Sequence, residues 1–364
     1  MPITRHGVRL ALGGLWVLDG LLQLQPAMFT PDFAHEVLAP AGEGQPWFVS
    51  APIELEVRVI AAQPVAWGVL FAVVQIALGV GLLLPRLARP AIVASLLWSM
   101  GVWWLGEGLG GLAGGHADIL MGAPGAVLLY AVLAVAAWPP DGGRPNSRTS
   151  LPGWLAVAWA IFWVGGAVLR VLPGQGRSAT IAAELNTMAD GAPDWLAHVQ
   201  TSVAATVLDW GTGLIVAFVL VCLVIGLGGL RPGRTRTVAV GVGIAVTLPF
   251  WVLGQSLGMP WSGLMTDPST GPLVVLMALG LIGITDPPPG PTRRWPHRGR
   301  TAAAGSGHGV EVTETAAVVV SAPYVSPAAL RVVYHPRPRT TVAEHVDTSP
   351  SGFVDDGVGG VQHR

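Results

Sequence analysis

The sequence predicts an all-α protein, a polytopic transmembrane bundle of eight helices in two parallel four-helix repeats, followed by a disordered C-terminal tail. Three observations predict this fold class. The 364 residues are 51% hydrophobic and only 11% charged, whereas soluble domains carry roughly a quarter charged residues. The apolar residues form long blocks separated by alternating basic and acidic segments. Related segments also recur along the chain at a nearly constant offset.

Eight apolar runs come close to the length of about 20 residues that a membrane helix needs. They are Val8–Gln25, Val65–Leu84, Ala91–Leu105, Ile119–Trp138, Leu155–Leu172, Trp210–Leu230, Val238–Leu257 and Pro272–Ile284. The third and the eighth are short, so we expect their helices to extend into the neighbouring loops. The sequence thus predicts eight membrane spans.

Basic segments mark one side of these spans. The chain has no Lys, and 13 of its 20 Arg residues gather before the first run and after every second run. They are Arg5 and Arg9, then Arg86 and Arg89, then Arg144 and Arg148, then Arg231, Arg234 and Arg236, and finally Arg293, Arg294, Arg298 and Arg300. The intervening loops are acidic or nearly neutral. By the positive-inside rule, both termini of this multi-pass plasma-membrane protein are expected in the cytoplasm.

The recurring segments are separated by 147 to 149 residues. Matched residues are Trp16 with Trp163, Glu107 with Gln255, Asp118 with Asp267, Gly122 with Gly271, and Pro124 with Pro272. A steady offset indicates a duplication, and an even number of spans in each copy gives both copies one orientation. The match also makes the first run the counterpart of an internal one, which favours a retained span over a cleaved signal peptide.

The predicted domains follow from the duplication. The first repeat covers residues 1–145 and the second covers residues 146–286. Residues 287–364 change to a composition rich in Pro and Gly, without an apolar run long enough to span a membrane. They are expected to form a disordered cytoplasmic tail.

Two stretches carry a resemblance to a known family. The run from Arg9 to Gln23 resembles the opening helix of DoxX-like membrane proteins, and the run from Gln75 to Ala88 resembles that family's second helix and the following loop. The resemblance covers roughly the first repeat and implies a four-helix membrane bundle. It also implies an accessory role beside respiratory or thiosulfate–quinone redox complexes. Gln75 departs from the family pattern, because such proteins often carry Glu there.

Polar residues inside the spans form the first candidate site. Asp19 and Gln23 are four residues apart and share one helix face, Gln75 lies midway along its run, and Arg170 occupies the position of Gln23 in the second copy. Since charges at membrane depth need a partner or a cavity, we expect Asp19 to approach Arg170 between the repeats. Such a pair could fix the packing or line a polar cavity for a solute, a proton or a quinone headgroup. Alternatively, Arg170 could reach the outer headgroups.

The second candidate site lies at the outer ends of two runs. Its members are Glu107, Asp118, Gln255 and Asp267, which the duplication places in two equivalent loops. Nearby glycines would allow a re-entrant turn or a close approach of helices. The loops could be inherited structural turns or the walls of a ligand-binding vestibule.

Other chemistry is disfavoured by what the sequence lacks. The single cysteine, Cys222, permits no internal disulfide, and no apolar run contains the histidines of a haem or copper centre. No phosphate-binding or hydrolase motif is present, and no basic face suggests nucleic acid. The sequence therefore predicts no catalytic residue, metal or cofactor.

Three functions agree with these features. The first is an accessory subunit that associates with a membrane oxidoreductase or another membrane subunit and has no activity of its own. The second is a transporter or binding protein for a small molecule, with a polar site between the repeats. The third is a membrane scaffold that recruits a partner through its C-terminal tail.

Overall fold

The computed structural model describes residues 3–140, 150–172 and 175–284. In these ranges all regular elements are helices and no strand is present, which confirms the predicted all-α class. The helices are α1 Arg5–Leu22, α2 Trp47–Ala62, α3 Pro64–Leu83, α4 Ala88–Leu105, α5 Ala126–Ala136, α6 Leu155–Arg170, α7 Ser178–Ala189, α8 Asp194–Leu230, α9 Arg234–Pro249 and α10 Thr270–Ile282. Short helical turns are η1 Pro26–Phe29, η2 Phe33–Leu38, η3 Ala39–Gly42, η4 Gly108–Gly111, η5 Phe250–Gly254 and η6 Ser256–Gly258. The predicted tail, residues 287–364, lies outside the described residues.

Three helical segments are long and apolar enough to cross a membrane. They are α3, α8 and the stretch Arg234–Gly254, which joins α9 to η5. Three further helices, α5, α6 and α10, are apolar but shorter. Length and composition therefore support membrane association for the chain.

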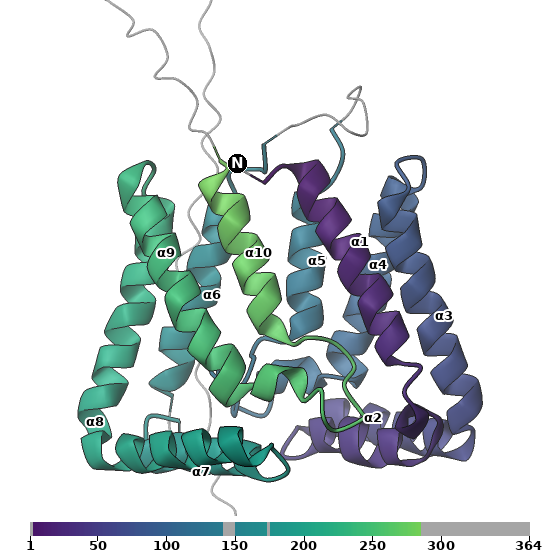
Figure 1. The fold of residues 1–364 in the computed structure, drawn as a ribbon, viewed down its shortest axis with the longest axis horizontal. Coiled ribbons are helices and arrows are strands. Elements are labelled where there is room, and N and C mark those ends of the chain that lie inside the picture. Colours follow the sequence, from purple (N-terminus) through teal and green to yellow (C-terminus); the bar gives the residue numbers. More distant parts are fainter. Residues whose placement is uncertain (1–2, 141–149, 173–174, 285–364) are drawn as a thin grey trace, which may run out of the picture. The chain divides into compact units, whose positions relative to one another are not determined.

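Two helices were not predicted from the sequence. Figure 1 shows α2 and α7 along the lower edge of the helical unit, across the direction of the other helices. The first part of α8 packs along α7, and α8 changes course at Gly211, whose φ of 53° and ψ of −134° are not helical. The predicted run Trp210–Leu230 is thus the second part of a longer element.

The two central helices are shorter than their predicted runs. α5 has 11 residues and begins at Ala126, seven residues after the predicted start at Ile119, because Gly122 and Gly125 adopt φ angles of 101° and 112° that do not continue a helix. α10 has 13 residues. At 1.5 Å per residue they rise only roughly 17 and 20 Å, against about 30 Å for a bilayer core. Both lie in the upper part of the unit, and irregular loops lie beneath them (Figure 1).

The core is built on α1, α5, α6 and α10. Trp16 of α1 and Trp159 and Trp163 of α6 are almost fully buried. Trp16 packs on Tyr130 of α5, with ring centroids 4.6 Å apart. Residues of α10 join the same hydrophobic cluster, so the short central helices hold the outer ones together.

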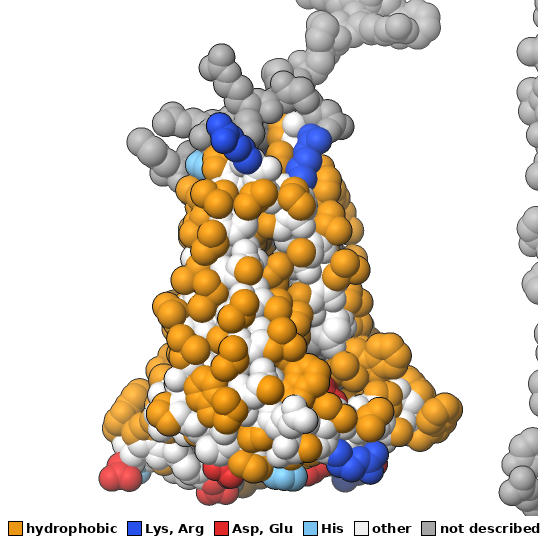
Figure 2. All heavy atoms as spheres, turned by 90° about the vertical axis from the view of Figure 1, so that its right-hand side faces the viewer, with side chains coloured by type: hydrophobic (Ala, Val, Ile, Leu, Met, Phe, Trp, Pro, Cys, Tyr) orange, Lys and Arg blue, Asp and Glu red, His pale blue; other side chains and the backbone are white. Residues whose placement is uncertain are grey.

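An apolar surface surrounds this core. Large side chains point outward from several helices, such as Val73 of α3, Leu97 of α4, Ile161 of α6 and Val224 of α8, each more than half exposed. Figure 2 shows hydrophobic side chains along the wall of the unit, Arg side chains at its upper end, and charged and His side chains at its lower end. Contiguous exposed apolar surface of this extent indicates contact with lipid or protein.

Candidate functional site

Two adjoining cavities open below the short central helices. The outer cavity, of about 700 Å³, is lined by the loops that follow α4 and α9 and by residues of α7 such as Glu184 and Met188. The inner cavity, of about 240 Å³, lies among α1, α3, α4 and α5. Val37, Glu107, Thr266 and Asp267 line both cavities and mark the place where they meet.

The structure divides the predicted residues between these cavities. Glu107, Asp118, Gln255 and Asp267 all line the outer cavity. Asp19, Gln23 and Gln75 line the inner cavity. Arg170 belongs to neither lining and is only 1% exposed, because it is enclosed by its own ion-pair network.

The turn after α4 places Glu107 at the junction. Glu107 Oε1 accepts a hydrogen bond of 3.2 Å from the Val127 amide in the first turn of α5, and Trp103 Nε1 donates to the Pro124 carbonyl at 2.7 Å. Gly110 has a φ of 62°, and a Cβ there would lie 2.2 Å from the Pro124 carbonyl oxygen. The close approach of the backbone at Gly110 to the backbone at Pro124 therefore requires glycine at position 110.

The turn after α9 makes the same two contacts. Trp251 Nε1 donates to the Pro268 carbonyl at 2.7 Å, and Gln255 Oε1 accepts from the Thr270 amide at 3.1 Å in the first turn of α10. Glu107 and Gln255 therefore play the same structural role, because each side chain accepts a hydrogen bond from the first turn of the next α-helix. These contacts relate Pro124 to Pro268, four residues before the Pro272 with which the sequence pairs it, because the second loop is shorter. The sequence matches of Gly122 with Gly271 and of Asp118 with Asp267 lie in the same loop and are displaced with it.

Asp118 and Asp267 both accept a hydrogen bond from the amide two residues later. The Leu120 amide donates to Asp118 Oδ1 at 3.0 Å, and the Ser269 amide donates to Asp267 Oδ1 at 2.7 Å. Their second oxygens differ, because Asp118 Oδ2 pairs with Arg170 and Asp267 Oδ2 accepts from the Thr266 hydroxyl at 2.9 Å. Only Asp267 lies at the junction of the cavities.

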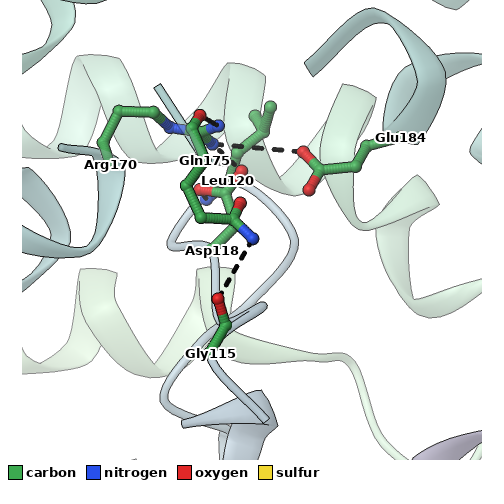
Figure 3. A network of polar contacts seen from close by, with 6 residues as sticks. All are labelled: Gly115, Asp118, Leu120, Arg170, Gln175 and Glu184. Carbon is green, nitrogen blue, oxygen red and sulfur yellow. Dashed lines mark hydrogen bonds and ion pairs between the residues drawn. The ribbon is translucent and has the colours of Figure 1, made fainter. Parts of the chain in front are cut away.

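Arg170 ties the loop between η4 and α5 to the second half of the chain (Figure 3). Its guanidinium forms a buried ion pair with Asp118, lies 4.0 Å from Glu184 Oε2 of α7 and donates to the Gln175 carbonyl at 3.0 Å. Gln175 Nε2 in turn donates to the Gly115 carbonyl at 3.3 Å. The loop through Gly115 and Asp118 is therefore fixed beneath α6.

The predicted pairing of Asp19 with Arg170 is wrong. Asp19 is buried, as we expected, but Oδ2 of its carboxylate accepts a hydrogen bond of 2.6 Å from the Tyr130 hydroxyl of α5. Arg170 pairs instead with Asp118. The loop of Asp118 passes below α6 and brings the Asp118 carboxylate to Arg170, so this charge pair joins the first half of the chain to the second.

Sequence analysis missed two residues of the inner cavity. Tyr130 is the one hydroxyl side chain in the apolar helix α5, which is a signal that could have been used. Glu56 also lines the inner cavity. It lies on α2, which carries several charged residues and is therefore not one of the predicted apolar runs.

Burial favours the protonated form of carboxyl groups in the lining of the two cavities. Burial, together with the nearby Asp267, raises the pKa of Glu107 to about 8. Burial also raises the pKa of Asp267 and raises that of Glu56 on α2 to about 7. Glu107 and Glu56 can therefore exchange protons in the physiological range, and a bound cation would favour their charged forms.

Comparisons with known proteins find no matching family model, no matching curated protein and no matching solved structure. Within the described residues, no group of three or more His, Cys, Asp or Glu side chains is arranged to hold a metal ion. The function is therefore inferred from the two cavities and the residues that line them.

Removing the charge of Asp118 should destabilise the protein strongly. Asp118→Asn keeps an acceptor for the Leu120 amide but removes the closest anionic partner of Arg170 and leaves it only Glu184 at 4.0 Å among the described residues, and breaking a buried pair costs about 3–5 kcal/mol. The free energy of unfolding in detergent measures the loss. Asp190→Asn, at an exposed carboxylate, is the matched control, and the double variant Asp118→Asn/Arg170→Met should recover part of the stability. Equal stability of Asp118→Asn and the control would contradict the anchoring role.

Glu107 should make stability depend on pH. Its pKa of about 8 in the folded protein lies above its usual value of 4.5, so the folded state binds this proton more tightly than the unfolded chain. The resulting stability is present at low pH and is lost as the pH rises through about 8. Between about pH 5 and about pH 8, the thermal midpoint of Glu107→Gln should therefore fall less than that of the wild type. Glu43→Gln, at an exposed position, should behave as wild type, and an unchanged pH slope for Glu107→Gln would refute the assignment.

Proposed function

We propose that this chain is an integral membrane protein with eight spans and both termini in the cytoplasm. The spans are α1, α3, α4, α5, α6, the second part of α8, α9 and α10. The apolar wall between an upper end with Arg side chains and a lower end that gathers the acidic side chains together with His and some Arg supports this arrangement (Figure 2). In it, α2, α7 and the first part of α8 lie at the outer surface, and the cavities open to the outside.

We also propose that the two halves are parallel copies of one unit. Corresponding contacts support the duplication. A Cβ on Gly79 would meet Val17 at 2.6 Å and the Gly13 carbonyl at 2.7 Å, and a Cβ on Gly226 would meet the matching Val164 at 2.9 Å and Ala160 carbonyl at 3.3 Å. Likewise, Gly81 faces Ala91 and Gly228 faces Ala239. The break at Gly211 within α8 corresponds to the break at Gln63 between α2 and α3.

We infer that the protein binds a small molecule in the cavity pair, as a binding protein or a transporter. The observation that carries this inference is the junction, where Glu107 from one half and Asp267 from the other face both cavities. Polar groups are expensive in a membrane protein unless they face a partner or a cavity. Here they gather around a space of a size that holds ligands.

The cavities favour binding over the other two roles that the sequence suggests. An accessory subunit or a scaffold needs an outer contact surface, and an internal polar space does not serve that purpose. The tail on which the scaffold hypothesis depends lies outside the described residues. The DoxX-like resemblance supports a second proposal, in which the protein associates with a membrane oxidoreductase. Such an association is compatible with a ligand site in the same chain.

Compounds that co-purify with the protein should test the binding role. The full chain is extracted in mild detergent, and the small molecules released on denaturation are identified by mass spectrometry. The variant Glu107→Gln/Asp267→Asn removes both junction carboxyls, so at least one compound should fall by about tenfold relative to wild type. Glu43→Gln is the control. Identical compound profiles from wild type and the junction variant would contradict a ligand site at this place.

A further inference from the structure

Aromatic rings form much of the wall of the inner cavity. Phe71 of α3 packs against Phe33 and Trp98, with ring centroids 6.1 and 5.8 Å away. Trp16 and Tyr130 form a second pair, 4.6 Å apart. All five rings line the cavity, so a ligand inside it meets ring surface from two groups of side chains.

The same wall presents several hydrogen-bond acceptors without a partner. They are Asp19 Oδ1, Gln23 Oε1, Glu56 Oε2, Gln75 Oε1 and Glu107 Oε2. Asp19 is 2% exposed and is held in place by Tyr130, which occupies only its other carboxylate oxygen. Buried acceptors are normally satisfied in folded proteins, so a cluster of unpartnered ones around one cavity indicates a ligand that donates hydrogen bonds.

The charge of this wall has one sign. Four carboxyl groups line the inner cavity, from Asp19, Glu56, Glu107 and Asp267. No Arg, Lys or His belongs to its lining among the residues that the structure describes. The nearby cation Arg170 is engaged with Asp118 and Glu184. An anionic ligand would find no counter-charge in this space, whereas a cation would find carboxyl groups that can give up a proton and pair with it.

We propose that the inner cavity binds a small organic ammonium ion, with its N–H groups on the Asp19 carboxylate and its apolar body among the aromatic rings. Carboxylates give charge-assisted hydrogen bonds to ammonium groups, and aromatic faces attract organic cations. The cavity volume of about 240 Å³ lies below the usual range for drug-sized ligands and therefore fits a small amine. This proposal rests on the proposed function and names its ligand class.

The ligand has a path from outside. The outer cavity adjoins the inner one at Glu107 and Asp267, so an ammonium ion passes two carboxyl groups before it reaches Asp19. Protons compete with it for the same carboxyls, since burial raises the pKa of Glu107 to about 8 and that of Glu56 to about 7. Asp19, Asp267 and Tyr130 complete the titratable groups in this lining, and binding should strengthen as the pH rises through neutrality.

The test compares a cation with a neutral molecule of the same shape. The probes are phenethylammonium and 2-phenylethanol, titrated calorimetrically into the full chain in detergent at about pH 8 and about pH 6. We expect the ammonium to bind the wild type about tenfold more tightly than the alcohol, and more weakly at the lower pH. The isosteric variant Asp19→Asn should lose the preference for the ammonium, and Glu54→Gln, at an exposed position on α2, should keep it.

Each outcome decides between the proposals. Equal or tighter binding of 2-phenylethanol overturns the ammonium site but leaves a small-molecule site in place. Binding of neither probe also overturns the ammonium site, and the co-purification experiment then decides the proposed function separately. If Asp19→Asn does not fold, Glu56→Gln on the surface helix α2 replaces it and should weaken the ammonium while leaving the alcohol unchanged. A Glu56→Gln variant that binds both probes as wild type does would count against the proposal.

Discussion

The buried ion pair of Arg170 with Asp118 is the constraint on which the arrangement of the cavities depends. Arg170 ends α6, and Asp118 lies in the loop that follows η4, so the pair joins the two halves of the chain. Burying both charges is costly, and the cost is offset only when the geometry and the surrounding hydrogen bonds are good. Gln175, Gly115 and Glu184 supply such contacts. The loop fixed in this way leads directly into Gly125 and α5, and so positions Glu107 against the Val127 amide.

The short central helices give the cavities their depth. Irregular backbone replaces helix beneath α5 and α10, and in the proposed membrane arrangement such backbone needs polar partners. The loops satisfy this need through Trp103, Trp251, Glu107 and Gln255. Glu107 makes in the first half the contact that Gln255 makes in the second. Together with Asp19 and Tyr130, it gives the inner cavity a polar wall. Most of the inner cavity is therefore lined by the first half of the chain, and Thr266 and Asp267 of the second half complete it.

Sequence reasoning succeeded where helical periodicity decides the outcome. The spacing of Asp19 and Gln23 places both on one helix face, and both line one cavity with Gln75. It failed where loop paths decide the outcome. Asp19 contacts Tyr130, and Arg170 contacts Asp118. Both contacts depend on the path of the glycine-containing loop between η4 and α5, which holds Asp118 and leads into the helix of Tyr130. The helices α2 and α7 lie along the lower edge of the unit and have no long apolar run, so Glu56 and Glu184 are absent from the predicted site residues.

The most direct test of the central claim is the side of the membrane on which the outer cavity opens. Thr187 of α7 is exposed and lines that cavity, whereas Thr235 of α9 is exposed beside the basic segment before that helix. Each is replaced by cysteine in a Cys222→Ser background, and intact cells are treated with a membrane-impermeant maleimide. The account predicts that Thr187→Cys is labelled on intact cells and that Thr235→Cys is labelled only after permeabilisation. Labelling of Thr235→Cys from outside, or protection of Thr187→Cys until permeabilisation, would contradict it.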